Sequence, residues 1–331
     1  MSTTTLAQGS NPGLTNTMQI FYDRVFLERA KIELRHDFGA DTKNIPMNSG
    51  KTVYFTRFSP LAIVTTALSE AVNPTAVDMT AATVSAVLAD YGAYTTVGSL
   101  YSMTSIETGL KEHISVHGQN AGESIDTLIR TEIKASATVV LVSTSTGGAA
   151  GSVTAISTIH TSDTLTGLEI RRVVRTLKNN KAPKFDSGLY RSIIGPYTAM
   201  DLMGNSEWLD AHRYTTSEAI ERGVVGKLHG VEFVETNNQA FTLTGGFSTS
   251  AANVANVYDN FFFGAHAYGV VNLGSNSAPK VYVKNPGSND TSNPIDQYST
   301  VGWKMPFVAK VLNSSWIIDL KTGASDGSST A

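Results

Sequence analysis

The segment Ser49-Gly50-Lys51-Thr52 looks like the end of a phosphate-binding loop, the first of the few places where this chain could do chemistry. Such a loop needs a second glycine five residues before Gly50, and Ile45 stands there. The residues that follow are typical of a strand, whereas a helix must follow so that its N-terminus can face the phosphates. We therefore predict that this segment binds no nucleotide.

A second chemical pattern is the pair His113 and His117, which has the i, i+4 spacing of two zinc ligands on one helix face. Ile114 follows the first histidine, at the position where a zinc protease has its glutamate, and the sequence offers no evident third ligand. We therefore expect two exposed or partner-facing histidines and no metal.

The remaining chemistry is equally sparse. The sequence has no cysteine, which excludes disulfides and cysteine-ligated metals, and it has neither a Gly-x-Ser-x-Gly elbow nor a glycine-rich dinucleotide turn. The acidic residues of the C-terminal half are scattered as on solvated helices: Asp201, Glu207, Asp210, Glu218 and Glu221. We predict no catalytic residue and no cofactor, and hence that the chain is not an enzyme.

One basic helix face has two open interpretations. Arg171, Arg175 and Lys178 lie opposite the apolar side of a segment that opens at Thr166. They are either a solvated face or a contact with a phosphate backbone or with acidic residues of a neighbouring subunit. Aromatic residues do not interleave with these charges, so base stacking is not supported.

Composition favours a surface that repels its own copies only weakly. Charged residues make up 16% of the 331 residues, below the roughly 25% of soluble domains, and the net charge is −3. Ser, Thr, Asn and Gly fill the difference, which suits either a self-packing chain or a β-rich protein with polar loops. The start lacks the pattern of a signal peptide, and the most apolar run, Val139–Val142, is far too short to span a membrane. We expect use in a cytoplasm.

The elements around these residues begin with a long two-stranded ribbon over residues 48–98. Its outgoing strand, Lys51–Phe58, alternates apolar side chains on both faces, and we place the return strand from Val84 to Val97. An isolated ribbon is marginal in water, so other copies of the chain are expected to cover it. We expect Phe55→Asp to leave a folded monomer and abolish particles. The predicted inter-subunit residues are Val53, Tyr54, Phe55, Arg57, Phe58, Tyr91 and Tyr94.

Helical periodicity and caps predict four helices before residue 180. The first spans Thr17 to Phe38 and the second runs from Thr104 to Gly118. A longer one over about 119–143 looks like a structural spine, and the cleanest begins at Thr166.

The C-terminal part alternates short strands and helices, with polar loops over 248–256 and 285–293 and a polar tail over 323–331. A helix is predicted from Thr198 to Trp208. The predicted strands are Tyr190–Ile194, Val231–Val234, Val257–Val271 and Lys280–Val283, with a closing hairpin of Phe307–Leu312 and Trp316–Leu320.

Several short segments occur in a fixed order along the chain: Asn48–Val53, Asp90–Tyr94, Glu221–Val231, Phe263–Gly269 and Val301–Lys304. Together they resemble the major capsid proteins of tailed bacteriophages, in the podophage coat-protein branch. The resemblance runs from about Thr17 to Leu320. It implies an α+β fold of the HK97 type, with an N-terminal arm, an extended β-ribbon loop, a spine helix, and peripheral and axial domains.

Laid onto this chain, the resemblance implies the following division: arm 1–48, extended loop 49–98, peripheral domain 99–162 with the spine over about 119–143, axial domain 163–297, return strands 298–322 and tail 323–331. It implies hexamers and pentamers of an icosahedral head around double-stranded DNA. A separate scaffolding protein, a portal and a decoration protein are the implied partners. The alternatives are a non-viral protein-compartment shell of the same fold and a secreted β-rich carbohydrate-active enzyme or adhesin.

Overall fold

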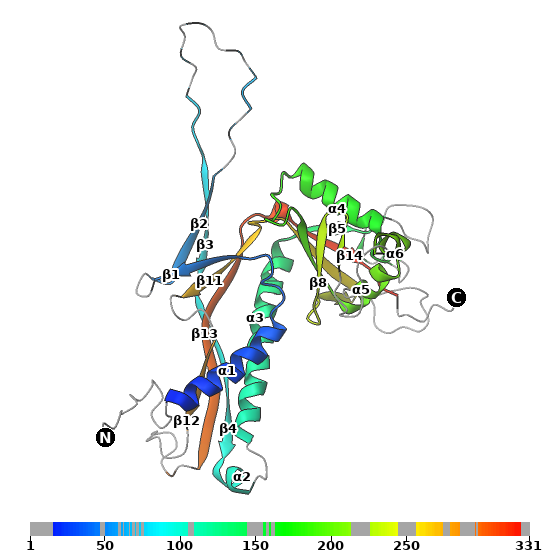
Figure 1. Cartoon of the computed structure of the whole chain (residues 1–331). Coiled ribbons are helices and arrows are strands. Elements are labelled where there is room, and N and C mark those ends of the chain that lie inside the picture. Colours follow the sequence, from blue (N-terminus) through cyan, green and yellow to red (C-terminus); the bar gives the residue numbers. More distant parts are fainter. Residues whose placement is uncertain are drawn as a thin grey trace, which may run out of the picture.

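The computed structural model describes residues 16–46, 50–58, 76–104, 109–143, 163–212, 226–243, 256–273, 279–284 and 297–325, with a few isolated positions between them. Figure 1 shows a ribbon that projects at the top, an elongated part below it, and a second part beside them. The long helix α3 passes from the elongated part toward the second one. It therefore connects the two parts.

The helices are α1 (Asn16–Glu33), α2 (Ser99–Thr104), α3 (Gly109–Ser136), α4 (Gly167–Asn179), α5 (Pro196–Met203) and α6 (Ser206–His212). The first eight strands are β1 (Asp41–Ile45), β2 (Thr52–Phe58), β3 (Ala81–Val87), β4 (Ala89–Gly98), β5 (Thr138–Leu141), β6 (Tyr190–Ile194), β7 (Lys227–Leu228) and β8 (Val231–Glu235). The others are β9 (Phe241–Leu243), β10 (Asn256–Phe263), β11 (Tyr268–Leu273), β12 (Lys280–Lys284), β13 (Tyr298–Val311) and β14 (Ile317–Thr322).

The elongated part is a sheet backed by α3. Its strand order is β1-β11-β13-β12, and β4 pairs with β13 over ten residue pairs. Alternate residues of β13 point toward α3, and Trp303 is 4% exposed in the core they share. Apolar side chains of α3 recur at helical spacing and fill this core: Ile114, Ile125, Ile129 and Ile133. The two faces of the sheet therefore differ, with one packed and one open.

Two glycines let α1 cross α3 closely. A Cβ at Gly118 would lie 2.6 Å from the carbonyl oxygen of Phe26, and one at Gly122 would lie 2.5 Å from that of Ala30. The prediction that Gly118 ends a helix is therefore wrong. The helix continues through both glycines because the contact with α1 outweighs their low helix propensity.

The second part is a seven-stranded sheet with the order β5-β14-β10-β6-β8-β7 and with β9 on β10. Helices α4, α5 and α6 cover one face, and the buried side of α4 supplies Ile170, Val173 and Leu177. Phe261 and Phe263 of β10 point to the other face, where they join the core of α3. This sheet is therefore buried on both sides over its central strands.

Some predicted elements are confirmed and others are corrected. Strands β2, β6, β8 and β12 and helix α4 match their predictions within about a residue. The helix predicted to 143 ends at Ser136, because the β-branched run Thr138–Leu141 forms β5 against β14. The helix predicted over 198–208 is two short helices, with Gly204 after the first. The predicted loop 285–293 and most of 248–256 lie outside the described residues.

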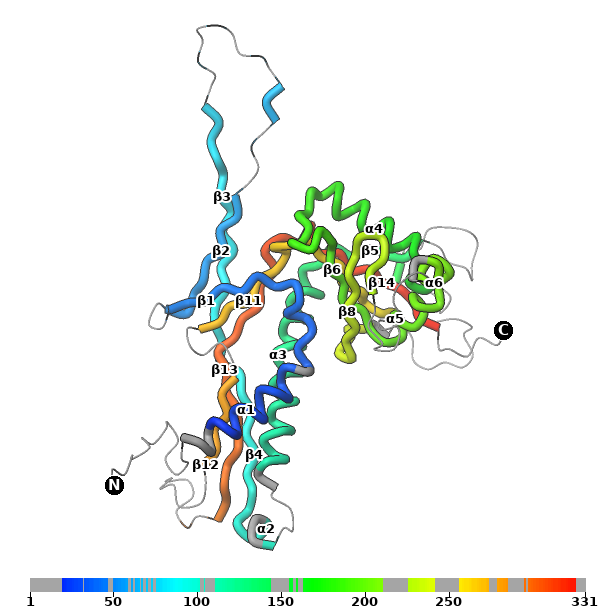
Figure 2. The backbone as a smooth tube through the Cα atoms, viewed as in Figure 1, coloured from blue at the N-terminus to red at the C-terminus, as the bar shows by residue number. Residues whose placement is uncertain are grey.

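The largest corrections concern strand pairing. The predicted closing hairpin does not form: β13 pairs with β4, β11 and β12, whereas β14 pairs with β10 and β5. The strand predicted over 257–271 is two strands, β10 and β11, which enter different sheets. β11 joins the sheet of β13, and β12 belongs to that sheet as well. The return strand of the ribbon is split as well. Only β3 pairs with β2, and the chain then continues as β4 along β13 (Figure 2).

Candidate assembly surfaces

One face of the ribbon is covered by the chain itself at its base. β2 and β3 pair antiparallel from Thr52 opposite Val87 to Phe58 opposite Ala81. Val53 is 5% exposed in a small cluster with Ile45 and Val271. Phe55 packs at the edge of this cluster, with the Lys43 ammonium 5.2 Å from its ring centroid. This face is anchored by β1 and β11.

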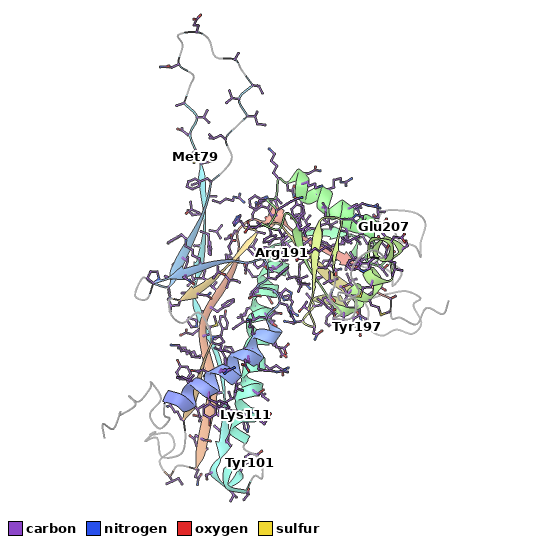
Figure 3. All side chains as sticks on the ribbon, viewed as in Figure 1. Met79, Tyr101, Lys111, Arg191, Tyr197 and Glu207 are labelled. Atoms are coloured by element: carbon purple, nitrogen blue, oxygen red, sulfur yellow. The ribbon has the colours of Figure 1, made fainter. Side chains whose placement is uncertain are left out.

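The other face of the ribbon is open. Tyr54 is 60% exposed and Phe58 is 63% exposed, and the small residues Ser85 and Ala81 stand opposite them on β3. Five large apolar side chains beyond Phe58, in the segment that leads to β3, are also exposed: Leu61, Ile63, Val64, Val77 and Met79. Figure 3 labels Met79. Over the described residues the chain gives Tyr54 and Phe58 no apolar cover, so this face of the ribbon leaves large apolar side chains exposed.

The predicted interface residues therefore separate into two groups. Tyr54, Arg57, Phe58 and Tyr94 are exposed, and their contact with a neighbour stays a prediction. Three others face the chain's own interior: Val53 is buried, while Phe55 and Tyr91 are partly buried against apolar clusters. Phe55→Asp would therefore disturb the base of the ribbon itself, and Phe58 is the cleaner position for that test.

A shallow groove lies on the open face of the sheet of β4, β12 and β13, and it was not predicted from the sequence. Tyr94 and Tyr282 stand on either side of Gly302, because β4 and β12 both pair with β13 at this residue. The groove has a volume of about 330 Å³ and is closed at one side by the Lys304–Asp90 ion pair, whose atoms are 2.8 Å apart. The glycine leaves the slot open, since a Cβ there would lie 2.7 Å from Tyr94.

The predicted basic face lies on the outside of α4. Arg171 donates to Glu207 at 3.1 Å, and His229 lies 2.8 Å from the other oxygen of the same carboxylate. The hydrogen bond from His229, followed by the charge of Arg171, holds the pKa of Glu207 below its usual range. Arg175 and Lys178 are exposed and have no partner among the described residues. The structure thus brings the three predicted cations together along one groove.

Two buried polar clusters fix the connection between the parts. The Asp126 carboxylate of α3 accepts from the backbone N–H groups of Arg35 and His36 and lies 2.8 Å from His36 Nδ1. Burial opposes its ionisation, but these hydrogen bonds outweigh it, so the pKa of Asp126 is lowered. Asn238 donates to the same carboxylate from the loop between β8 and β9 of the second sheet. Helix α3, the segment after α1 and the second sheet are thereby joined.

The second cluster lies on the sheet face toward α3. Lys321 is within 2.5 Å of Asp259 and 2.9 Å of Asp319, and Lys134 of α3 lies 2.6 Å from Asp259. Burial, and then the negative charge of Asp259, raise the pKa of Asp319 to about 6. Two buried carboxylates therefore share two ammonium groups at the joint between α3 and the sheet.

The histidine pair lies on one face of α3, where His117 is buried and its Nε2 lies 2.9 Å from Thr95 Oγ1, so the expectation of an exposed or partner-facing side chain is wrong for His117. Among the described residues no group of three His, Cys, Asp or Glu side chains could hold a metal ion. Nor is any helix in that part of the chain both long and apolar enough to cross a bilayer. In the segment that looks like the end of a phosphate-binding loop, Lys51 and Thr52 lead directly into strand β2. A helix does not follow them, as nucleotide binding would require.

Comparison with known proteins gives a consistent result. No protein-family profile matches the chain, and no curated protein matches it by sequence. Among solved structures, "Capsid of Ralstonia phage GP4" has a TM-score of 0.68 at 12% identity, over 90% of this chain and 93% of that one. "Cyanophage Pam1 capsid asymmetric unit" has a TM-score of 0.64 at 15% identity, over 98% of both chains.

The chain has the α+β fold of phage capsid subunits. This confirms the fold expected from the sequence resemblance, over nearly the whole chain. A third similar structure is a virus-like particle. "Crystal structure of virus-like particle from Pyrococcus furiosus" has a TM-score of 0.51 at 10% identity, over 92% of this chain and 99% of that one.

Proposed function

We propose that this chain is a major capsid protein that self-assembles into the hexamers and pentamers of an icosahedral phage head around double-stranded DNA. The observation that carries the proposal is the open apolar face of the ribbon, with Tyr54 and Phe58 about three-fifths exposed. Exposed apolar side chains on a projecting two-stranded ribbon mark a surface that another molecule covers. The capsid fold across the whole chain makes a second copy the natural cover.

The proposed division changes the predicted one where the strand pairing differs: β4 leaves the extended loop, β11 and β12 leave the axial domain, and β5 and β14 join the axial domain. The extended loop comprises 49–88, and the peripheral domain comprises α2, α3, β4 and β11–β13. The axial domain comprises 163–263 together with β5 and β14. The N-terminal arm comprises residues 1–48, and it contains α1 and β1.

In this proposal each subunit lays its ribbon across an adjacent subunit. A standard interface buries about 1,600 Å², and apolar burial contributes about 25 cal/mol per Å² before association costs. Because each subunit makes several contacts at once, loss of one subunit from the shell is slow. Contact with packaged DNA would be weak and independent of sequence, since the net charge is −3.

The role is structural and not enzymatic, and the place of action is the virion, after assembly in the host cytoplasm. We propose three protein partners besides the chain itself: a separate scaffolding protein, a portal and a decoration protein. A membrane has no part in the proposed function. The whole-chain capsid fold gives no support to the alternative of a secreted β-rich enzyme or adhesin.

A second candidate function is a protein-compartment shell of the same fold. It is favoured by the likeness to the virus-like particle from Pyrococcus furiosus, although the TM-score of 0.51 is lower than the phage values. The two candidates differ in cargo, because a phage head encloses DNA and a compartment encloses protein.

Electron microscopy of the overexpressed, purified full chain tests both. We expect closed shells or capsomers, and nuclease-protected DNA in particles recovered from the native source. Protein cargo without DNA would favour the compartment. A compact monomer at millimolar concentration, with no lattice under any condition, would refute self-assembly.

A further inference from the structure

Two unlike edges lie at opposite ends of the strands in the axial sheet. β6 starts at Tyr190, opposite Val231 and beside the His229 turn, and it ends at Ile194, just before α5. A five-residue strand spans roughly 16 Å, so the His229 turn and the start of α5 lie about that far apart along β6. Figure 1 shows α4 along the upper side of this part and α5 at its lower side.

The upper edge is basic and hollowed. Residues 167–184 contain six lysines and arginines and one acid, Glu169. The groove on this edge has a volume of about 360 Å³ and is lined by Arg171, Val174, Arg175, Lys178, Asn179 and His229. Glu207 already neutralises Arg171, whereas Arg175 and Lys178 have no acidic partner among the described residues. The groove therefore offers an apolar floor between two unneutralised cations.

The lower edge is aromatic, and the base that contacts it, Arg130 of α3, is already bonded to Asn238 and to the Gln239 carbonyl. Tyr197, Met200 and Phe241 are each more than half exposed. The Tyr197 ring lies 5.5 Å from that of Tyr258, which pairs with Phe241, so the three rings form one surface. Residues 195–210 and 235–243 contain no lysine or arginine, and Asp201 and Glu235 are acids at this edge. Figure 3 labels Tyr197 on this lower side.

We infer that the α4 edge of one copy docks on the α5 edge of the next copy, with Tyr197 entering the groove between Arg175 and Lys178. Arginine and lysine are attracted to the face of an aromatic ring, and the acids complete the charge match. This inference rests on the proposed function and specifies it, since it names the two surfaces that meet. Two basic edges would repel each other, so the contact is head-to-tail.

A head-to-tail contact between opposite edges repeats in one direction and closes into a ring if the rotation allows. The ribbon projects on the same upper side of the molecule as α4 in Figure 1. A single neighbour on that side would therefore meet both surfaces. The arrangement explains why the two edges differ in charge, which a monomer has no need of.

The absence of cysteine from the chain makes a direct test possible. Three double variants place one cysteine on each edge: Tyr197→Cys with Arg171→Cys, Arg175→Cys or Lys178→Cys. Under oxidation we expect at least one of them to give covalent multimers up to the ring on a non-reducing gel. The corresponding single variants should stay monomeric on that gel. A mixture of two single variants should stop at the dimer, because each copy then offers only one reactive edge.

Charge reversal on α4 is the second test of the inference. Arg175→Glu with Lys178→Glu should raise the concentration needed for assembly at least tenfold and leave thermal unfolding unchanged, since both side chains are exposed. Lys111→Glu, on exposed α3 surface (Figure 3), is the matched control and should assemble normally.

Each outcome bears on a different claim. The inference is overturned if the unchanged chain forms particles while all three cysteine pairs stay uncrosslinked, or if the charge-reversed variant assembles at the normal concentration. Normal assembly with loss of DNA retention alone would assign α4 to phosphate contact and also overturn it. If the unchanged chain forms no particle at all, the proposed function itself fails.

Discussion

Replacement of the two exposed ribbon aromatics tests the proposed function most directly. Tyr54 is 60% exposed and Phe58 is 63% exposed, on the face that the chain leaves open. Aromatic side chains bury about 150–250 Å² each, so about 240 Å² remain for a neighbour to cover. At about 25 cal/mol per Å² this contributes at most about 6 kcal/mol for each subunit. If half of it is realised, Tyr54→Ser with Phe58→Ser removes about 3 kcal/mol.

A loss of about 3 kcal/mol corresponds to more than a 100-fold change in an association constant. We therefore expect the double variant to assemble only at a concentration about 100-fold higher, measured by light scattering and negative-stain microscopy. Its urea unfolding should stay within about 0.5 kcal/mol of the unchanged chain, because surface substitutions rarely exceed that. Thr56→Ala is the matched control, since Thr56 lies between the two aromatics on the same face. Assembly of the double variant within threefold of the normal concentration would refute the reasoning.

Three further predictions concern the fold. Gly122→Leu should destabilise the chain by about 1–3 kcal/mol in urea unfolding because its side chain collides with α1, whereas Gly98→Ala should have little effect, since nothing lies within 4 Å of a Cβ there. The Asp319 pKa of about 6 exceeds its unfolded value of about 3.9, so its contribution to stability is present below pH 4 and is lost as the pH rises through 6. The difference between pH 4.5 and 7.5 is about 2 kcal/mol, and Asp319→Asn should remove this part of the pH dependence. Asp126→Ala should cost about 3–5 kcal/mol, whereas a cost below 1 kcal/mol would show that its bonds to His36 are dispensable.

Local signals explain which elements could be predicted. Helix α4 was predictable because Ile170, Val173 and Leu177 recur on one face, and all three are buried. Strand β6 was predictable because Gly195 and Pro196 end a short segment that contains Tyr190, Ile193 and Ile194. These signals depend on residues within a few positions of one another.

The candidate surfaces were less predictable. The ribbon residues were identified from alternation, but alternation does not tell which face the chain itself covers. β1 and β11 decide that, since they enclose Val53 and leave Tyr54 in solvent. The aromatic edge of the seven-stranded sheet was missed because Tyr197 and Phe241 lie far apart in the sequence and meet only through Tyr258.

The sequence by itself determined that this chain carries more apolar ribbon than two strands can hide, no evident catalytic group and no cysteine. It also determined the apolar periodicity from which α4 and the C-terminal half of α3 form. Only the tertiary structure decided which strands pair, since β4 and β13 are separated by 200 residues and either could have paired with its neighbour in sequence. It decided too that Gly118 and Gly122 serve a helix crossing. A glycine ends a helix or admits a second one according to what packs against it, and that information lies outside its local sequence.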